Sequence, residues 1–146
     1  MTIEIENVNT DALSQLQSEG ISVFPDPQMI RLIQDKGLQK QFLADHGFPT
    51  APFHLVNSRE ELSRFSDFLP FVVKLRRAGY DGRGVQMMQN PLDFERGFDA
   101  PSVVEQRADL AGEMAVLVAR SWTGEIKVYR PVQMLMNPTT HMLLLS

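Results

Sequence analysis

A glycine-rich segment between two apolar runs constrains the fold of this chain more than any other feature. Phe71–Val73 and Val85–Met88 have the composition of buried strands, and between them Gly79–Gly84 holds three glycines in six residues. Glycine permits positive φ angles and exposes backbone N–H groups, while Arg83 adds a rigid cationic fork, so the segment suits a phosphate or a carboxylate. The pattern predicts a hairpin whose loop either binds an anion or is an ordinary connection.

The common glycine-rich nucleotide motifs do not fit this segment. Gly79 and Gly84 have the spacing of a P-loop, but Val85 stands where that motif requires lysine. A strand is also predicted to follow, where a P-loop continues into a helix. The dinucleotide-binding fingerprint is absent as well, so the loop belongs to neither class.

Composition excludes several other kinds of protein. The chain has 146 residues, 43% of them hydrophobic and 22% charged, which fits one globular domain. It has no cysteine, so disulfides, thiolate metal sites and cysteine nucleophiles are excluded. The net charge of −4 gives no electrostatic footprint for nucleic acid, and no apolar run is long enough to span a membrane. We expect a soluble, cytoplasmic protein with no nucleic-acid or membrane partner.

Hydrophobic periodicity and turn residues place helices mainly in the first part of the chain and strands in the rest. Predicted helices cover Asp11–Ser18, Gln28–Gln34, Asp35–His46, Arg59–Phe68 (with a capping box between Ser58 and Glu61) and Pro91–Phe98 (with Asn90 as its N-cap). Predicted strands cover Thr2–Val8, Ile21–Phe24, Phe71–Val73, Val85–Met88, Ser102–Gln106, Gly112–Ala119, Ile126–Tyr129 and Met142–Leu145. This order predicts an α+β fold.

Three charged residues stand where predicted strands begin or end. Lys74 follows a buried run, where a cation needs a partner anion, so it either binds a ligand or extends its amine to solvent. Glu105 and Glu113 are either site residues or solvated edge charges. The histidines show no metal-ligand spacing; they are His46, His54 and His141.

Several of these segments together resemble the ATP-grasp enzymes, and most closely the 5-(carboxyamino)imidazole ribonucleotide synthetase (PurK) family. The resemblance runs from about Glu4 to about Tyr129. It rests on Asp35–Lys40, Phe48–Pro52, Val73-Lys74, Gly79–Gly84, Val104–Gln106 and Gly112-Glu113. Gly-Tyr-Asp-Gly-Arg-Gly after Val-Lys is the most specific of these motifs.

The resemblance implies an ATP-dependent carboxylation in purine biosynthesis. ATP would phosphorylate bicarbonate, and the carboxyphosphate would carboxylate 5-aminoimidazole ribonucleotide, leaving ADP and phosphate. By position, Lys36 and Lys74 resemble the cations that reach the ATP phosphates, and Gly79–Val85 resembles the loop that closes over them. Glu105–Ala108 resembles the adenine-binding hinge strand, and Glu113 the ribose ligand. The implied ATP-binding residues are Lys36, Lys74, Gly79, Tyr80, Asp81, Gly82, Arg83, Gly84, Val85, Glu105, Gln106, Arg107, Ala108 and Glu113.

The resemblance also implies that Tyr80, Asp81 and Arg83 approach the imidazole ribonucleotide, with Asp81 and Arg83 catalytic. Phosphoryl transfer depends on positioning and charge neutralisation, which lysines, an arginine and a glycine-rich loop supply. The alternatives are another ATP-grasp carboxylase or ligase, and a non-catalytic nucleotide-binding module.

The family's usual length is more than twice that of this chain, so we interpret the chain as a fragment that is inactive alone. Residues 1–27 would be the tail of a Rossmann-like domain, and 28–146 the first part of the ATP-grasp domain. The magnesium ligands would lie outside this chain, and the full-length enzyme would be a homodimer. The apolar run at Leu143–Leu145 predicts self-association through an open sheet edge.

Overall fold

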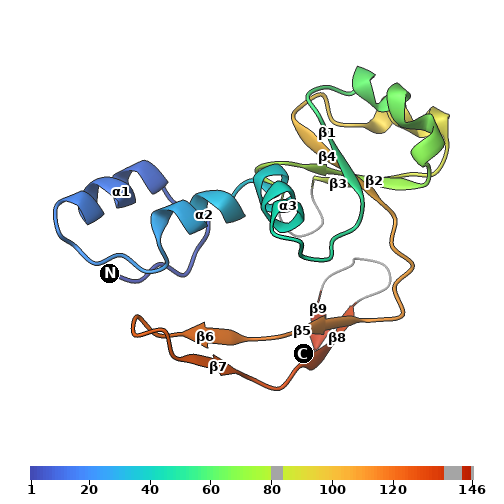
Figure 1. Ribbon diagram of the computed structural model, residues 1–146. Coiled ribbons are helices and arrows are strands. Elements are labelled where there is room, and N and C mark those ends of the chain that lie inside the picture. The colour runs from blue at the N-terminus through green and yellow to red at the C-terminus, as the bar shows by residue number, and fades with distance from the viewer. Residues whose placement is uncertain (80–83, 137–142, 146) are drawn as a thin grey trace. The chain divides into compact units, whose positions relative to one another are not determined.

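The computed structural model describes residues 1–79, 84–136 and 143–145, and these residues form two compact units (Figure 1). The first unit covers Met1–Arg107 and the second covers Ala108–Ser146. Helices are confined to the first unit among the described residues, and strands occur in both, which confirms the α+β class. The division predicted between residues 27 and 28 stays a prediction. No helix among the described residues is long and apolar enough to cross a membrane.

Two short helices form the first part of the first unit. α1 (Thr10–Ser18) and α2 (Pro27–Ile33) begin at the N-caps Asn9 and Asp26, whose side chains accept hydrogen bonds from first-turn N–H groups. Their apolar faces meet in a small cluster of buried side chains, namely Leu13, Val23 and Ile30.

The strands predicted over Thr2–Val8 and Ile21–Phe24 do not form, and this prediction was wrong. A single parallel bridge joins Thr2 to Phe24, through the hydrogen bonds Ile3 N–H to Phe24 O (2.8 Å) and Phe24 N–H to Met1 O (3.0 Å). A ladder needs more paired residues, and Pro25, which has no N–H, follows immediately.

A four-stranded antiparallel sheet forms the rest of the first unit. Its order is β1-β4-β2-β3. The strands are β1 (Phe53–Val56), β4 (Ser102–Gln106), β2 (Phe71–Leu75) and β3 (Val85–Met88). The hairpin predicted on either side of the glycine-rich segment is confirmed, because β2 and β3 pair antiparallel with Lys74 opposite Val85.

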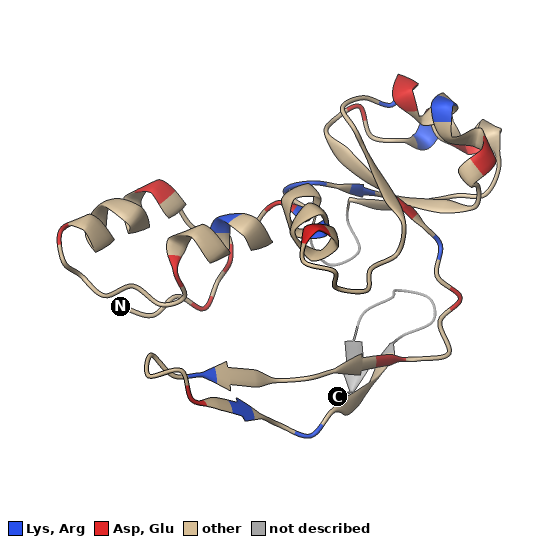
Figure 2. Cartoon of the chain, viewed as in Figure 1, with Lys and Arg blue, Asp and Glu red and all other residues tan. Residues whose placement is uncertain are grey.

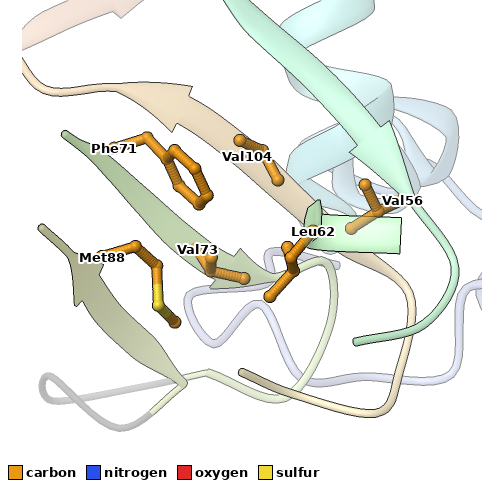
Figure 3. Close-up of a cluster of buried hydrophobic side chains, with 6 residues drawn as sticks. All are labelled: Val56, Leu62, Phe71, Val73, Met88 and Val104. Carbon is orange, nitrogen blue, oxygen red and sulfur yellow. The ribbon is translucent and has the colours of Figure 1, made fainter. Parts of the chain in front are cut away.

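The two faces of this sheet have different coverings (Figure 1). One face packs against two 3-10 helices, η1 (Glu60–Phe68) and η2 (Pro91–Arg96), around the buried cluster in Figure 3. That cluster consists of Val56, Leu62, Phe71, Val73, Met88 and Val104. The other face is next to α3 (Lys36–Asp45). Because side chains alternate along a strand, Phe71 and Val73 enter the core while Lys74 lies on the face of α3.

The ends of the 3-10 helices test two predicted caps. Asn90 is the N-cap of η2, as predicted. Asp93 completes a capping box with it. The capping box predicted between Ser58 and Glu61 was wrong, because no side chain caps η1 and the Glu61 carboxylate accepts from the Asn57 N–H at 3.0 Å. Both segments form helices as predicted, of the 3-10 type, and η2 ends at Arg96, two residues before the predicted end.

The second unit contains strands only, among its described residues. β5 (Glu113–Ala115), β8 (Val132–Met136) and β9 (Leu143–Leu145) form a sheet of order β5-β8-β9, and β6 (Val118–Arg120) pairs with β7 (Ile126–Val128). The predicted hairpin around Trp122–Glu125 is confirmed: Gly124 has φ +90° and donates to Ser121 O at 3.0 Å. The single strand predicted over Gly112–Ala119 is divided into β5 and the start of β6.

Candidate functional site

A carboxylate held between two lysines lies on the α3 face of the first sheet. In the β2–β4 register Val72 is opposite Glu105, which places Lys74 on the same face two residues further along β2. Lys74 Nζ donates to Glu105 Oε2 at 3.2 Å, and Lys40 Nζ, from α3, approaches the same oxygen at 3.2 Å. The alternation of β2 therefore brings the predicted cation and the predicted carboxylate into contact.

Lys40 is a site residue that sequence reasoning did not single out. Its Nζ also donates to Thr50 Oγ1 at 2.5 Å and to Ala51 O at 3.3 Å, and it lies 5.6 Å from the centroid of the Phe53 ring. Its position in the motif Asp35–Lys40, four residues after Lys36, was the available signal. Only the packing of α3 on the sheet reveals that it faces Glu105.

Asp35 fixes the start of α3 to the end of β2. Its side chain is the N-cap of α3, accepting from Gly37 N–H at 2.9 Å and Leu38 N–H at 3.2 Å. It also pairs with Arg76 through two hydrogen bonds of 2.8 Å, and Arg77 approaches at 3.4 Å. Figure 2 shows basic residues, in blue, where β2 ends next to α3. This bidentate geometry is the strong form of an ion pair.

Opposing effects set the pKa of Asp35, whose residue is 4% exposed. Burial alone would raise this pKa, but the hydrogen bonds from Arg76 and from the backbone N–H groups of Leu38 and Gly37, with the charge of Arg76, lower it below its ordinary value. The hydrogen bond to Asp35 in turn raises the pKa of Arg76, against its partial burial. Asp35 is therefore ionised over the whole neutral range.

Gly37 allows this close contact between α3 and Arg76. A Cβ built on Gly37 would lie 2.6 Å from Arg76 Nε, a distance that real Cβ atoms do not reach. Arg76 cannot retreat easily because its guanidinium is bonded to Asp35. The Asp35–Lys36–Gly37 sequence thus combines a cap, a cation and a missing side chain, and it places Lys36 beside the glycine-rich segment.

Lys36 lies next to one end of the glycine-rich segment. Its Nζ donates to Gly79 O at 3.4 Å, and its backbone N–H donates to Arg76 O at 2.9 Å. The two ends of the segment approach each other closely. A Cβ on Gly84, which has φ +80°, would lie 2.9 Å from Gly79 Cα. The fold therefore brings Lys36 and Gly79 together.

A pocket of about 620 Å³ opens beside this segment within the first unit. Lys36, Arg77 and Gly79 line one part of it, and apolar side chains including Ile5, Val8 and Ile33 line another, together with Glu6, Asn7, Gln34 and Ala78. Cations and an exposed backbone next to apolar walls suit an organic anion.

The remaining predicted site residues divide into three groups. Tyr80, Asp81, Gly82 and Arg83 lie outside the described residues. Gln106 and Arg107 continue β4 in the first unit, donating their N–H groups to Pro52 O at 2.9 Å and to Pro70 O at 3.4 Å, and Val85 opens β3. Ala108 and Glu113 belong to the second unit, where Glu113 opens β5 and is exposed. Within the described ranges, no group of three or more histidines and carboxylates is placed to hold a metal ion.

The first unit thus brings together two lysines around a carboxylate, and a third lysine beside the glycine-rich hairpin. The family model of the ATP-grasp domain matches residues 41–142, so the chain belongs to the ATP-grasp family. The family resemblance read from the sequence motifs is thereby confirmed.

Among the individual proteins that the chain resembles are carboxylases and synthetases of aminoimidazole ribonucleotides. The chain is 37% identical over 142 residues to a phosphoribosylaminoimidazole carboxylase from Candida glabrata, covering 91% of this chain and 25% of the relative. The crystal structure of N5-carboxyaminoimidazole ribonucleotide synthetase from Thermotoga maritima matches with a TM-score of 0.81 and 34% identity, covering 91% of this chain and 35% of that one.

A second solved structure contains ligands. N5-carboxyaminoimidazole synthase from Aspergillus clavatus, in complex with ADP and 5-aminoimidazole ribonucleotide, matches with a TM-score of 0.81 and 29% identity over 97% of this chain and 38% of that one. The chain therefore spans between a quarter and two fifths of the length of these relatives.

Proposed function

We propose that this chain supplies ATP-binding residues of an enzyme that carboxylates 5-aminoimidazole ribonucleotide in purine biosynthesis. In this reaction ATP transfers its γ-phosphoryl group to bicarbonate, giving ADP and carboxyphosphate. The exocyclic amine then attacks the carboxyphosphate carbon and loses a proton, and phosphate leaves, giving 5-(carboxyamino)imidazole ribonucleotide. The observation that carries the proposal is the Lys40–Glu105–Lys74 cluster on the same sheet as the glycine-rich hairpin.

The described residues support separate roles for the two predicted phosphate cations. Lys74 is partly exposed on the α3 face of the sheet and Lys36 is next to one end of the hairpin loop, so both can approach an anion bound along the hairpin. Cations placed in advance neutralise the charge that develops on transferred phosphoryl oxygens without reorganising. In the proposal Gly79–Val85 covers the phosphates and excludes water, which protects carboxyphosphate from hydrolysis.

The other proposed contacts follow the family pattern. Glu105–Ala108 would bind adenine through backbone groups and a carboxylate, and Glu113 would bind the ribose hydroxyls. Tyr80, Asp81 and Arg83 would contact the imidazole ribonucleotide, with Asp81 and Arg83 catalytic. The pocket beside Gly79 supports only the phosphate contacts of the proposal, because it offers Lys36 and Arg77 to a phosphate next to apolar walls. Magnesium would accompany the nucleotide phosphates, and no step uses a metal ligand from this chain. A cytoplasmic homodimer is part of the same proposal.

Calorimetric titration of Mg-ADP into the chain tests the nucleotide site. The wild-type chain is expected to bind ADP, and Lys74→Ala to weaken binding about tenfold, the effect of losing one charge-assisted contact. Lys127→Ala is the control, because Lys127 is an exposed lysine of the second unit that pairs with Glu125. A wild-type chain that does not bind ADP, or equal affinities for wild type and Lys74→Ala, would contradict the proposal.

A further inference from the structure

Glu105 has two lysine partners, and their surroundings differ. Both ammonium groups lie 3.2 Å from Glu105 Oε2, so distance alone does not distinguish them. The Lys40 side chain is 12% exposed and the Lys74 side chain 32% exposed, around a Glu105 side chain that is 17% exposed. One lysine is therefore enclosed and the other is open to solvent on one side.

Lys40 is held by more than its ion pair. Thr50 Oγ1 and Ala51 O accept hydrogen bonds from its ammonium, and the Phe53 ring lies beneath it, in addition to the ion pair with Glu105. These partners come from the segment before β1 and from β1 itself. Moving Lys40 away from Glu105 would break several contacts in a half-buried place, where unmade polar contacts are costly.

Lys74 has only Glu105 among the described acceptors. Its Nζ makes one hydrogen bond, to Glu105 Oε2, at the end of β2 that leads into the glycine-rich segment. A long, flexible ammonium side chain with a single partially exposed partner exchanges that partner at little cost. If Lys74 were the sole partner of Glu105, however, its departure would leave a mostly enclosed carboxylate unpaired.

We propose that Lys40 is a positioning residue: it stays paired with Glu105 and thereby releases Lys74 to move from Glu105 to a bound phosphate. This inference rests on the proposed nucleotide site and deepens it. Lys40 itself does not touch the phosphates. It keeps Glu105 neutralised in both states, so the exchange of Lys74 between a carboxylate and a phosphate leaves no charge unpaired.

Competitive labelling of lysine amines with acetic anhydride, read by mass spectrometry, tests this in the chain without nucleotide. In the wild type Lys74 should react faster than Lys40. In Lys40→Met, which keeps the apolar stem over Phe53, Lys74 should react about fivefold more slowly because Glu105 now holds it alone. In the double variant Lys40→Met/Glu105→Gln, Lys74 should regain its reactivity. Lys74→Met should leave the reactivity of Lys40 unchanged.

Thr50→Val is a second variant that keeps all the charges, and it serves if Lys40→Met fails to fold. Removing the Thr50 hydroxyl should increase the labelling of Lys40 and leave that of Lys74 unchanged. The proposal is overturned if Lys40 reacts as fast as Lys74 in the wild type, if Lys74 is unaffected by Lys40→Met, or if Thr50→Val leaves Lys40 unchanged.

Labelling in the presence of ADP separates this proposal from the function it rests on. ADP should protect Lys74 and leave Lys40 unchanged in the wild type, and Lys40→Met should weaken ADP binding in the Glu105 background but not in the Glu105→Gln background. Failure of ADP to bind the wild type contradicts the proposed function, while the nucleotide-free labelling still decides the relation between Lys40 and Lys74. Protection of both lysines to the same extent would show that Lys40 contacts the ligand itself.

Discussion

Asp35 joins two separate parts of the first unit through one carboxylate. It caps α3, holds Arg76 in bidentate geometry and attracts Arg77, so the start of α3 cannot move without the end of β2. Lys36 follows Asp35 directly, so the contacts of Asp35 also fix the position of the Lys36 backbone. The contribution of Asp35 to the free energy of unfolding is electrostatic, because its ionised carboxylate accepts every one of these hydrogen bonds.

Asp35→Asn tests that electrostatic contribution and keeps the cap, since asparagine is an equally good N-cap. The lowered pKa of Asp35 means that its stabilisation is fully present above the ordinary aspartate pKa and is lost as pH falls through the lower folded value. At pH 7 the variant should lose about 2 kcal/mol of unfolding free energy, less than for a fully buried pair because the arginines are partly exposed. The difference should shrink progressively from about pH 4 downward.

Urea denaturation of both proteins from pH 7 to pH 3, followed by circular dichroism, measures this difference. Asp11→Asn is the matched control, because the ion pair between Asp11 and Arg31 is exposed and should contribute less than about 1 kcal/mol. A penalty for Asp35→Asn that stays constant across this pH range would show that its charge is not responsible.

At the scale of elements, the hairpin of β2 and β3 depends on a glycine at its closing position. Gly84 has φ +80° and its O accepts from Leu75 N–H at 2.8 Å, and a Cβ built on Gly84 would lie 2.9 Å from the α-carbon of Gly79. The hairpin of β6 and β7 also has a glycine with positive φ, Gly124, but nothing lies within 4 Å of a Cβ built there. An alanine at Gly124 would therefore add backbone strain alone, whereas an alanine at Gly84 would add backbone strain and a steric clash.

Gly84→Ala should destabilise the first unit by about 2 to 3 kcal/mol, because a left-handed alanine costs about 1 to 2 kcal/mol and the clash with Gly79 adds to it. Gly124→Ala should destabilise the second unit only by the cost of a left-handed alanine. The chain offers a probe for each unit: described helices, and so the helical dichroism, belong to the first, and the single tryptophan, Trp122, belongs to the second. Gly84→Ala should shift the dichroism transition and Gly124→Ala the fluorescence transition. Equal shifts for both variants in both signals would contradict this assignment.

Local sequence patterns predicted the elements well and the contacts between them only in part. The apolar run Phe71–Val73 predicted β2, and the glycines predicted the hairpin, because both signals depend on neighbours in the sequence. The pairing of Lys74 with Glu105 follows once β2 and β4 are known to be neighbours. Lys40 was missed because its contact with Glu105 requires α3 to pack on one particular face, and Arg76 because it pairs with a residue far earlier in the chain.

At the scale of the whole molecule, apolar side chains are distributed unequally between the units. Every residue of the buried hydrophobic core belongs to the first unit, as far as the described residues extend. The second unit exposes many large apolar side chains, among them Leu110, Met114, Leu117, Trp122, Val128 and Tyr129. Two- and three-stranded sheets without a covered face are marginal by themselves. Exposed apolar area of this kind favours association.

Self-association through β9 is the resulting prediction, because β9 is an edge strand that pairs with β8 on one side only in the described sheet. The apparent mass measured by sedimentation equilibrium should rise with protein concentration. Leu144→Lys, a charge on the edge strand, should shift the chain toward monomer by about tenfold in dissociation constant, since charged residues are the natural defence of sheet edges. Leu92→Lys is the matched control, because Leu92 is 87% exposed on η2 of the first unit and should change nothing. A monomer at every concentration contradicts the prediction, and equal effects of the two lysines would place the contact away from β9.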